Sequence, residues 1–360
     1  MMKEVAHIAS IEAWLHHQLV GRMALAPGGV VGPWPFDVAK RRWSSSSLLC
    51  KALGYKRRWL PDIVDTGQIV GTITAAVAQK TGLPSDLPLY SIGGDKQAEA
   101  LGAGLRLGAS GAAVSLGTAS TLCAPTLVPR ISHSYRWFTL AAAEPEAFLL
   151  EYMVFRGMWT VGWFARELAR DLHGEASRQK CAVEGLLCTE AEGVPAGADG
   201  LLALPRWSPS LQYPAEAGAW LGLRETHSRA HMYRALLEGI AFDLRRGRMV
   251  IEKAARMKID EVRVGGGGAK SPLMVQMLAD VLNVKVIKPK SEELAARGAA
   301  IVAAIGAGLH PSVSSAVEAM VPEPSVVEPN PMRASLYRRR YKEAYLPALE
   351  RSRSFPGLNR

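Results

Sequence analysis

The most informative part of the sequence is residues 261–287, EVRVGGGGAKSPLMVQMLADVLNVKVI. Its first residues, Glu261–Val264, alternate between polar and apolar side chains, as a half-buried strand does. Four consecutive glycines follow at Gly265–Gly268. Ser271 and Pro272 then have the residue types that favour a helix N-cap and the first helical position. This order predicts a strand that passes through a tight glycine turn into a helix.

The rest of this region extends the same pattern. Apolar residues between Leu273 and Leu282 fall on one face of a helix, and Asn283 is a residue type that can end one. A second strand is predicted at Val284–Ile287, and a helix rich in small residues is predicted at Leu294–Ala307. Alternating strands and helices favour an α/β fold with a partly parallel sheet.

Other elements are expected earlier in the chain. The first hundred residues indicate helices and loops, and from Gly111 the pattern changes to strand-like runs, so we place a domain boundary near 107–111. The expected elements are strands at Gly111–Thr121, Trp137–Ala143 and Phe148–Met153, and amphipathic helices at Gly157–Leu172 and Ser228–Met257.

Composition limits the class of protein. Of the 360 residues, 48% are hydrophobic and 21% are charged, which is ample for a large buried core. At about 100 to 200 residues per domain, this length suggests two domains. The formal net charge is +10, which permits an anionic partner. The basic residues form no nucleic-acid-reading motif with interleaved aromatics, so we expect no nucleic-acid partner.

Cysteine usage and hydropathy limit the class further. The four cysteines are far apart and lack metal-ligand spacing, so neither a disulfide framework nor a metal site is expected: Cys50, Cys123, Cys181 and Cys188. The most apolar stretch, Gly298–Leu309, is too short to cross a bilayer, and the chain does not open with a signal-peptide pattern. We therefore expect a soluble cytoplasmic protein without a membrane partner.

Two glycine-containing turns could bind phosphate. The turn at Gly265–Gly268 would expose backbone N–H groups at the positive end of a helix. It is not a Walker A loop, because Ala269 rather than glycine precedes Lys270. A second turn, Ser115–Ser120, offers amides and hydroxyls. Taken alone, the first turn is more often a tight connection, and the second is equally typical of a β-hairpin.

Asp95 lies where a strand is expected to end and a helix to begin. It follows the apolar run Leu87–Ile92 and two glycines, at the kind of position where α/β sheets present their chemistry. An aspartate there is either a helix N-cap, which the local sequence favours, or a general base toward a hydroxyl. The expected helix, Lys96–Leu105, contains Gly102 and Gly104, which would allow a neighbouring element to pack closely.

Together these motifs resemble those of the FGGY carbohydrate kinases, ATP-dependent sugar and polyol kinases with an actin-like, ribonuclease-H-like fold. Residues 91–104, SIGGDKQAEALGAG, are similar to the family's turn with the catalytic aspartate, and residues 115–120, SLGTAS, to its second phosphate loop. Residues 265–280 resemble the signature on the adenosine side, and residues 234–242, RALLEGIAF, resemble the helix before it. The resemblance is closest to xylulokinase-like members and runs from about His7 to His310.

The resemblance implies a role for each matching residue. Asp95 would take the proton from the sugar hydroxyl, and Lys96 and Gln97 would lie beside the sugar. The nucleotide would be bound by small residues from three segments: Gly117, Thr118, Gly157, Gly266, Gly267, Gly268 and Ser271. ATP with Mg²⁺ would be the phosphate donor, and no residue is assigned as a metal ligand.

The resemblance also implies an incomplete first domain. Complete members begin with a strand and a D-x-G-T loop, and Met1 enters after that region. We expect an α/β, two-domain kinase in which residues 1–109 are the remaining part of the N-terminal, sugar-side domain. Residues 110–325 would form the nucleotide-side domain, and residues 326–360 a basic tail with one short helix.

Two functions remain open at this point. The chain would either phosphorylate a sugar or polyol, or be a truncated, inactive remnant that at most binds nucleotide. Missing strands would leave unpaired sheet edges and exposed apolar surface. We therefore expect a homo-oligomer, an aggregation-prone chain, or a chain paired with a separate N-terminal fragment.

Overall fold

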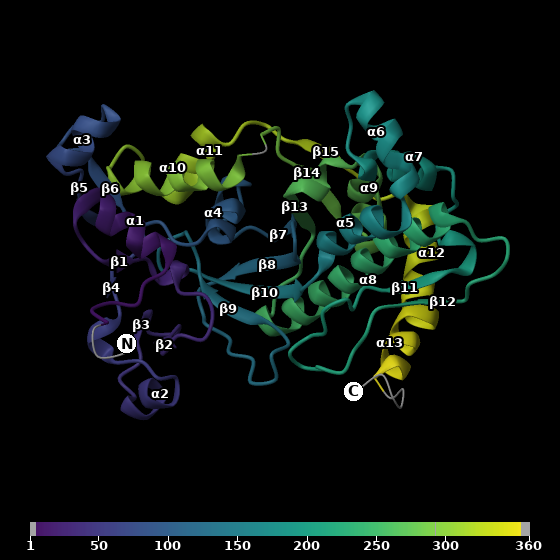
Figure 1. The fold of residues 1–360 in the computed structure, drawn as a ribbon, viewed down its shortest axis with the longest axis horizontal. Coiled ribbons are helices and arrows are strands. Elements are labelled where there is room, and N and C mark those ends of the chain that lie inside the picture. Colours follow the sequence, from purple (N-terminus) through teal and green to yellow (C-terminus); the bar gives the residue numbers. More distant parts are fainter. Residues whose placement is uncertain (1–4, 292, 354–360) are drawn as a thin grey trace.

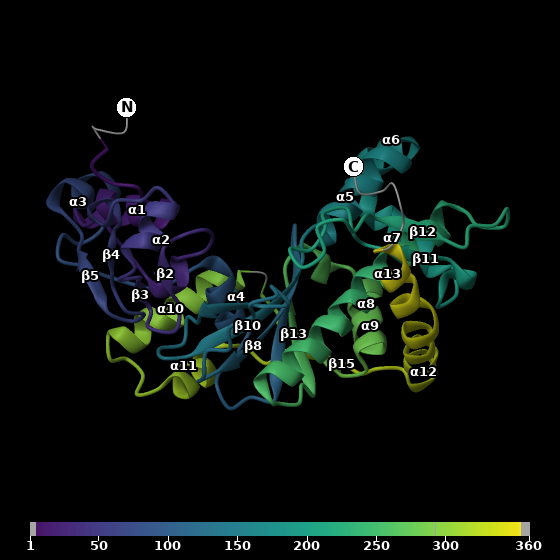
Figure 2. The ribbon, with the colours of Figure 1, turned by 90° about the horizontal axis from the view of Figure 1, so that it is seen from below.

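The computed structural model describes residues 5–291 and 293–353. The molecule is elongated, with a large sheet between its two ends (Figure 1). The N-terminal part lies on one side of strands β8 and β10, and the region of α5 to α7 lies on the other (Figure 2).

A seven-stranded sheet has the strand order β15-β14-β13-β7-β8-β10-β9. Strand β13 (Glu261–Gly265) pairs in parallel with both β7 (Gly111–Leu116) and β14 (Lys285–Lys288). The other pairs are antiparallel and add β8 (Ser120–Thr126), β9 (Phe138–Ala141), β10 (Phe148–Val154) and β15 (Ser325–Val327). The partly parallel sheet predicted from residues 261–287 is thus confirmed.

Helices on the C-terminal side pack against this sheet and form the main hydrophobic core. The long helix α8 (Arg229–Ala255) buries Leu236, Ile240 and Leu244, whose four-residue spacing predicted it. It contacts β8, β10 and helix α9 (Pro272–Leu282). The surrounding elements are α5 (Gly157–Leu168), α6 (His173–Gln179), α7 (Val183–Glu192), β11 (Leu202–Leu204) and β12 (Ala219–Leu221).

The N-terminal part consists of short elements. Its helices are α1 (Ile11–Val20), α2 (Ser47–Ala52) and α3 (Ala75–Thr81). Its strands form three separate pairs: β1 (Ala24–Leu25) with β4 (Asp62–Ile63), β2 (Phe36–Asp37) with β3 (Arg42–Trp43), and β5 (Ile69–Thr72) with β6 (Pro88–Tyr90). Strands this short have no clear period-two pattern, so the sequence indicated mainly helices and loops in this region. The strand expected at Leu87–Ile92 is confirmed by β6.

Large apolar side chains are exposed on two of these helices. Ile11 and Trp14 of α1 and Leu48 of α2 are 77%, 51% and 75% exposed. Exposed apolar surface of this kind is typical of contact regions. The expected oligomer or partner fragment stays a prediction.

Helix α4 (Asp95–Gly102) packs closely against α10 (Leu294–Gly306). A Cβ at Gly102 would overlap the carbonyl oxygen of Leu294, and a Cβ at Gly298 would overlap the carbonyl oxygen of Ala98. The close approach predicted for Gly102 is therefore confirmed. Helices α10 and α11 (Val313–Met320) consequently lie beside α4 and the N-terminal part, although they are far along the chain (Figure 1).

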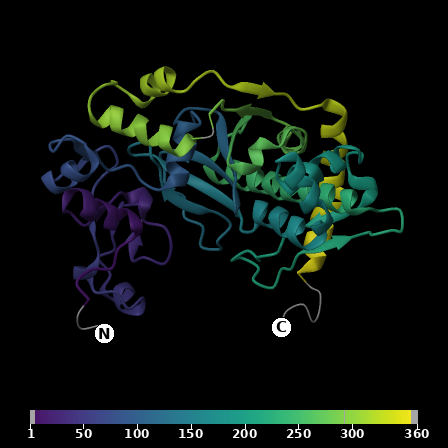
Figure 3. The same ribbon diagram turned by 45° about the horizontal axis from the view of Figure 1, so that its top comes forward.

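The segment after β15 is folded and does not form a tail. The chain runs along one edge of the molecule through β15 into α12 (Pro331–Arg340), a π-helical turn and α13 (Leu346–Ser352) (Figure 3). Three tyrosines four residues apart are buried against Phe242 of α8: Tyr337, Tyr341 and Tyr345. Their spacing places them on one helix face, so the expectation of a basic tail at 326–360 is corrected for the described residues.

All four cysteines are free thiols, and Cys181 is exposed. Among the described residues, no helix combines the length and hydrophobicity that a membrane span requires.

Replacing Gly298 with alanine should destabilise the protein, because the new methyl group would push α4 and α10 apart. We expect the free energy of unfolding to fall by about 2 kcal/mol or more, measured by urea denaturation. Gly174→Ala is the matched control, since Gly174 is exposed on α6 and a Cβ there would make only an ordinary contact with Arg178. The free energy of unfolding of the control should rise by about 0.5–1 kcal/mol, because alanine favours a helix more than glycine does. Equal changes in the two variants would contradict the close packing.

Candidate active site

A cavity of about 630 Å³ lies where the two predicted glycine turns meet. We call it the glycine-lined cavity. Helix α5 contributes Met158 and Trp159 to its wall, and Cys188 and Tyr233 come from α7 and α8. Five of the residues predicted to bind nucleotide line it together: Gly117, Thr118, Gly267, Gly268 and Ser271.

Sheet order brings the two turns together. Strands β7 and β13 are neighbours and run in parallel, with Ser115 opposite Gly265. The turns that follow them therefore leave the same edge of the sheet, where α/β proteins commonly bind ligands. Gly266 has a φ of 81°, and a Cβ there would lie 2.8 Å from the Leu116 backbone. Glycine at 266 is what allows the two turns to touch.

The turn at Ser115–Ser120 is a β-hairpin between β7 and β8, which is one of the two interpretations its sequence allowed. Gly117 donates its backbone N–H to the Ala119 carbonyl at 3.1 Å. Thr118 is exposed at the tip and lines the cavity. The hairpin therefore presents the Thr118 side chain to the cavity. A hairpin turn and a phosphate-binding turn are thus compatible interpretations of this segment.

Gly157 has a supporting position. It is the first residue of α5, and a Cβ there would overlap Ser120. The next two residues, Met158 and Trp159, donate their backbone N–H groups to carbonyls of the hairpin turn, each at 3.2 Å. Gly157 does not line the cavity but lets α5 begin against the turn.

The four-glycine turn at Gly265–Gly268 is open toward solvent at Gly267. A Cβ at Gly267 would have no atom within 4 Å, and the residue is exposed. Ser271 is the N-cap of α9 as predicted, and its Oγ accepts the Met274 N–H at 3.2 Å. Gly266 is not among the cavity-lining residues, and its contribution is the steric one described above.

Asp95 is the first residue of α4, and the N-cap is Gly94. The capping interpretation of Asp95 is therefore wrong, because Gly94 already occupies the extended conformation that begins the helix. The Asp95 side chain is exposed, and its Oδ1 accepts the Lys96 N–H at 2.7 Å. Asp95 is not among the residues lining the glycine-lined cavity, but the next residue connects its helix to the hairpin.

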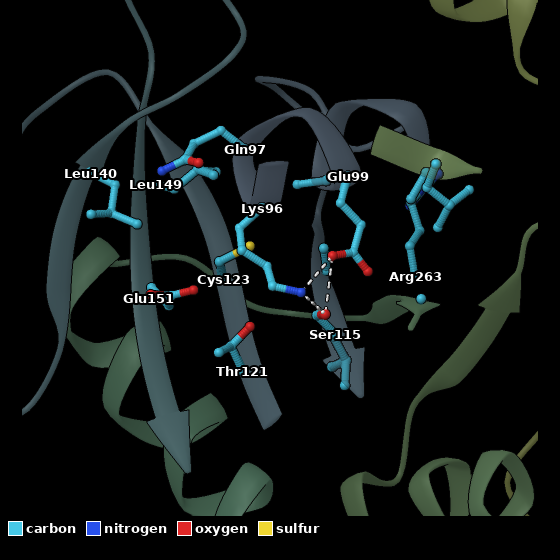
Figure 4. Close-up of a pocket in the computed structure, with 16 residues that line it drawn as sticks. Lys96, Gln97, Glu99, Ser115, Thr121, Cys123, Leu140, Leu149, Glu151 and Arg263 are labelled. Carbon is cyan, nitrogen blue, oxygen red and sulfur yellow. Dashed lines mark hydrogen bonds and ion pairs between the residues drawn. The ribbon is translucent and has the colours of Figure 1, made fainter. Parts of the chain in front are cut away.

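Lys96 forms a closed triangle of hydrogen bonds with Glu99 and Ser115 (Figure 4). Its Nζ lies 2.9 Å from Glu99 Oε2 and 2.7 Å from Ser115 Oγ, and Ser115 Oγ donates to Glu99 Oε2 at 3.0 Å. We call these three residues the lysine triangle. Because Ser115 is in β7, the triangle joins the helix of Asp95 to the strand that leads into the hairpin turn.

Gln97 was predicted to lie beside the sugar, and its side chain is 2% exposed. It packs beneath the glycines before Asp95 and against Gly28, where a Cβ would lie 3.7 Å from Gln97 Cγ. Its position is that of a support for the turn. Its contact with sugar stays a prediction.

Glu151 is a site residue that the sequence analysis missed. It lies on β10 beneath α4, and its side chain points into the space below Lys96 (Figure 4). Its pKa is raised to about 7, mainly by burial. Lys96 and a hydrogen bond to Thr121 oppose the shift, and nearby Asp95 and Glu99 add to it. A single polar residue within the apolar run of β10 was the available signal.

Among residues 5–291 and 293–353, no group of three or more His, Cys, Asp or Glu side chains could hold a metal ion.

Family models match both parts of the chain. The model for the N-terminal domain of the FGGY family of carbohydrate kinases matches residues 1–102. The model for the C-terminal domain of the same family matches residues 112–307. The segment between the two matches, residues 103–111, contains the expected boundary.

Individual relatives agree with these matches. An uncharacterized sugar kinase of Escherichia coli K12, YgcE, is 32% identical over 320 residues, which is 88% of this chain and 64% of the relative. The xylulose kinase of Bacillus subtilis 168 is 26% identical over 94% of this chain and 66% of the relative. The chain thus spans about two thirds of the length of these relatives.

A solved structure confirms the fold. The ligand-bound xylulose kinase of Lactobacillus acidophilus superposes with a TM-score of 0.83 over 98% of this chain and 69% of that chain, at 22% identity. The expected two-domain, actin-like α/β fold is therefore the fold of this protein.

Gly266→Ala should lower stability, because alanine disfavours a φ of 81° and its methyl group would meet the Leu116 backbone. We expect a loss of at least about 2 kcal/mol in unfolding free energy. Gly267→Ala, one residue away in open space, should change it by less than about 1 kcal/mol. If urea denaturation showed a larger loss of unfolding free energy for Gly267→Ala than for Gly266→Ala, the contact between the two turns would be contradicted.

Glu151→Gln should change how stability depends on pH. Because the folded pKa is raised above the ordinary value of 4.5, the folded state holds this proton more tightly, and stability falls as pH rises from about 4.5 to about 7. The amide cannot ionise, so the variant avoids this loss. The difference in unfolding free energy, variant minus parent, should therefore be roughly 2 kcal/mol larger at pH 8 than at pH 5. Glu318→Gln, at a largely exposed side chain, is the control. Its difference in unfolding free energy from the parent protein should be the same at both pH values. A pH-independent difference for Glu151→Gln would contradict a protonated buried carboxyl group.

Proposed function

The chain belongs to the FGGY family of carbohydrate kinases, and from this premise we propose that it transfers the γ-phosphoryl group of ATP to a hydroxyl of a sugar or polyol. The observation that carries the proposal is the glycine-lined cavity, whose wall contains residues from both motifs expected to bind nucleotide. Relatives named as xylulose kinases support a small carbohydrate as acceptor.

The nucleotide would occupy the glycine-lined cavity. Gly117 and Thr118 at the hairpin tip would bind phosphate oxygens, because an exposed amide-rich turn and a hydroxyl suit that chemistry. Gly267, Gly268 and Ser271 would border the adenosine side. Gly157 and Gly266 would act indirectly, since their lack of a Cβ permits the close contacts that shape the cavity.

Asp95 would act as the general base. Its exposed carboxylate would take the proton from the acceptor hydroxyl as that oxygen forms a bond to the γ-phosphorus. The bond from the γ-phosphorus to the β–γ bridging oxygen breaks at the same time, and ADP leaves with its electron pair. Positioning and charge neutralisation supply most of the catalysis in such transfers.

Mg²⁺ would enter as the complex with ATP and neutralise phosphate charge. Its ligands would be mainly phosphate oxygens and water, which is usual for this ion.

Asp95→Asn tests the proposal. The amide cannot accept the proton, so we expect kcat to fall by about 10²- to 10⁴-fold, while the affinity for ATP stays within about twofold. ADP release would be measured with a panel of ketoses, aldoses and polyols, and ATP affinity by calorimetry. Asp86→Asn, at an exposed aspartate before β6, is the control and should keep full activity.

Two results would contradict the proposal. Equal turnover by Asp95→Asn and the parent protein would exclude Asp95 as the base. ATP binding without turnover of any acceptor by the parent protein would favour the inactive remnant.

A further inference from the structure

The lysine triangle touches all three motif regions. Lys96 and Glu99 belong to the helix that Asp95 begins, and Ser115 belongs to the strand before the hairpin turn. Glu99 also approaches the four-glycine turn, because a Cβ at Gly265 would lie 2.5 Å from Glu99 Oε1. One cation is therefore bound where the three segments converge.

The Lys96 ammonium is directed toward the hairpin. Its Nζ would lie 3.6 Å from a Cβ placed on Gly117, a residue that lines the glycine-lined cavity. The Lys96 side chain is 41% exposed, whereas that of its partner Glu99 is 16% exposed. The Lys96 side chain is thus bound to two oxygens and is still partly exposed to solvent.

The ammonium has capacity for a further ligand. It carries three N–H donors, and within the described part of the chain it binds the two oxygens of the triangle. The acidic groups nearby are Asp95, Glu99 and Glu151, while Arg263 lines the pocket beside Lys96 and Lys270 lines the glycine-lined cavity. A polyphosphate approaching the hairpin would be repelled by ionised carboxylates, and Lys96 is a cation beside Gly117 that would offset that repulsion on this side of the turn.

We propose that Lys96 binds the terminal phosphate of the nucleotide at the hairpin turn, and that Glu99 holds the ammonium there and competes with the phosphate for it. The inference rests on the proposed function, since it assumes a nucleotide in the glycine-lined cavity. It differs from the expectation that Lys96 contacts the sugar, because the ammonium is bound to the strand that leads into the hairpin.

The test compares ligands that differ only in phosphate number. Calorimetry would measure the binding of adenosine, AMP, ADP and ATP to the parent protein, Lys96→Gln and Glu99→Gln. Lys96→Gln should weaken ATP binding about tenfold and leave adenosine binding unchanged, because one charge-assisted hydrogen bond is lost. Glu99→Gln should tighten ATP binding several-fold, because the ammonium loses its competing carboxylate. Lys80→Gln, at an exposed lysine on α3, controls for the change in net charge and should match the parent protein.

The outcomes separate this inference from the proposed function. Equal losses for adenosine and ATP in Lys96→Gln would mean that the lysine only maintains structure, and an unchanged ATP affinity would mean that it binds no phosphate. Either result overturns the inference and leaves the proposed function standing. Weaker acceptor binding with unchanged ATP binding would overturn it in favour of the sugar contact. If the parent protein binds none of the four ligands, the proposed function itself fails.

Discussion

The parallel pairing of β7 with β13 is the constraint on which the rest of the site depends. Two adjacent parallel strands end at the same edge of a sheet, so the turns that follow them must meet there. With Ser115 opposite Gly265, the hairpin tip and the four-glycine turn come into contact, and a side chain at Gly266 would block that contact. The glycine-lined cavity is a direct result of this register.

A second contact brings the helix of Asp95 to the same edge. Gly102 and Gly298 let the backbones of α4 and α10 come into direct contact. This packing holds α4 over the strands. The lysine triangle then connects α4 to β7 through charge-assisted hydrogen bonds, which are stronger than neutral ones. Burial of Glu151 beneath the triangle raises its pKa to about 7, so this carboxyl group can gain or lose a proton near neutral pH.

Local signals in the sequence were sufficient for most of the elements around the site. The N-cap at Ser271 and the helix end at Asn283 follow from residue type, and the close packing at Gly102 follows from the missing side chain. The same reasoning failed at Asp95, because a capping preference alone does not distinguish it from its neighbour Gly94. It also failed after β15, where a run of arginines concealed tyrosines at helical spacing that α8 buries.

By itself, the sequence determined the strands, turns and helices of residues 261–287 and the presence of two glycine turns, because those signals lie within a few neighbouring residues. Only the tertiary structure decided that Gly266 touches Leu116, that Lys96 turns toward Ser115, and that Glu151 is buried. These contacts depend on strand order and on which helices cross. Both are set by packing between distant segments, which no local periodicity encodes.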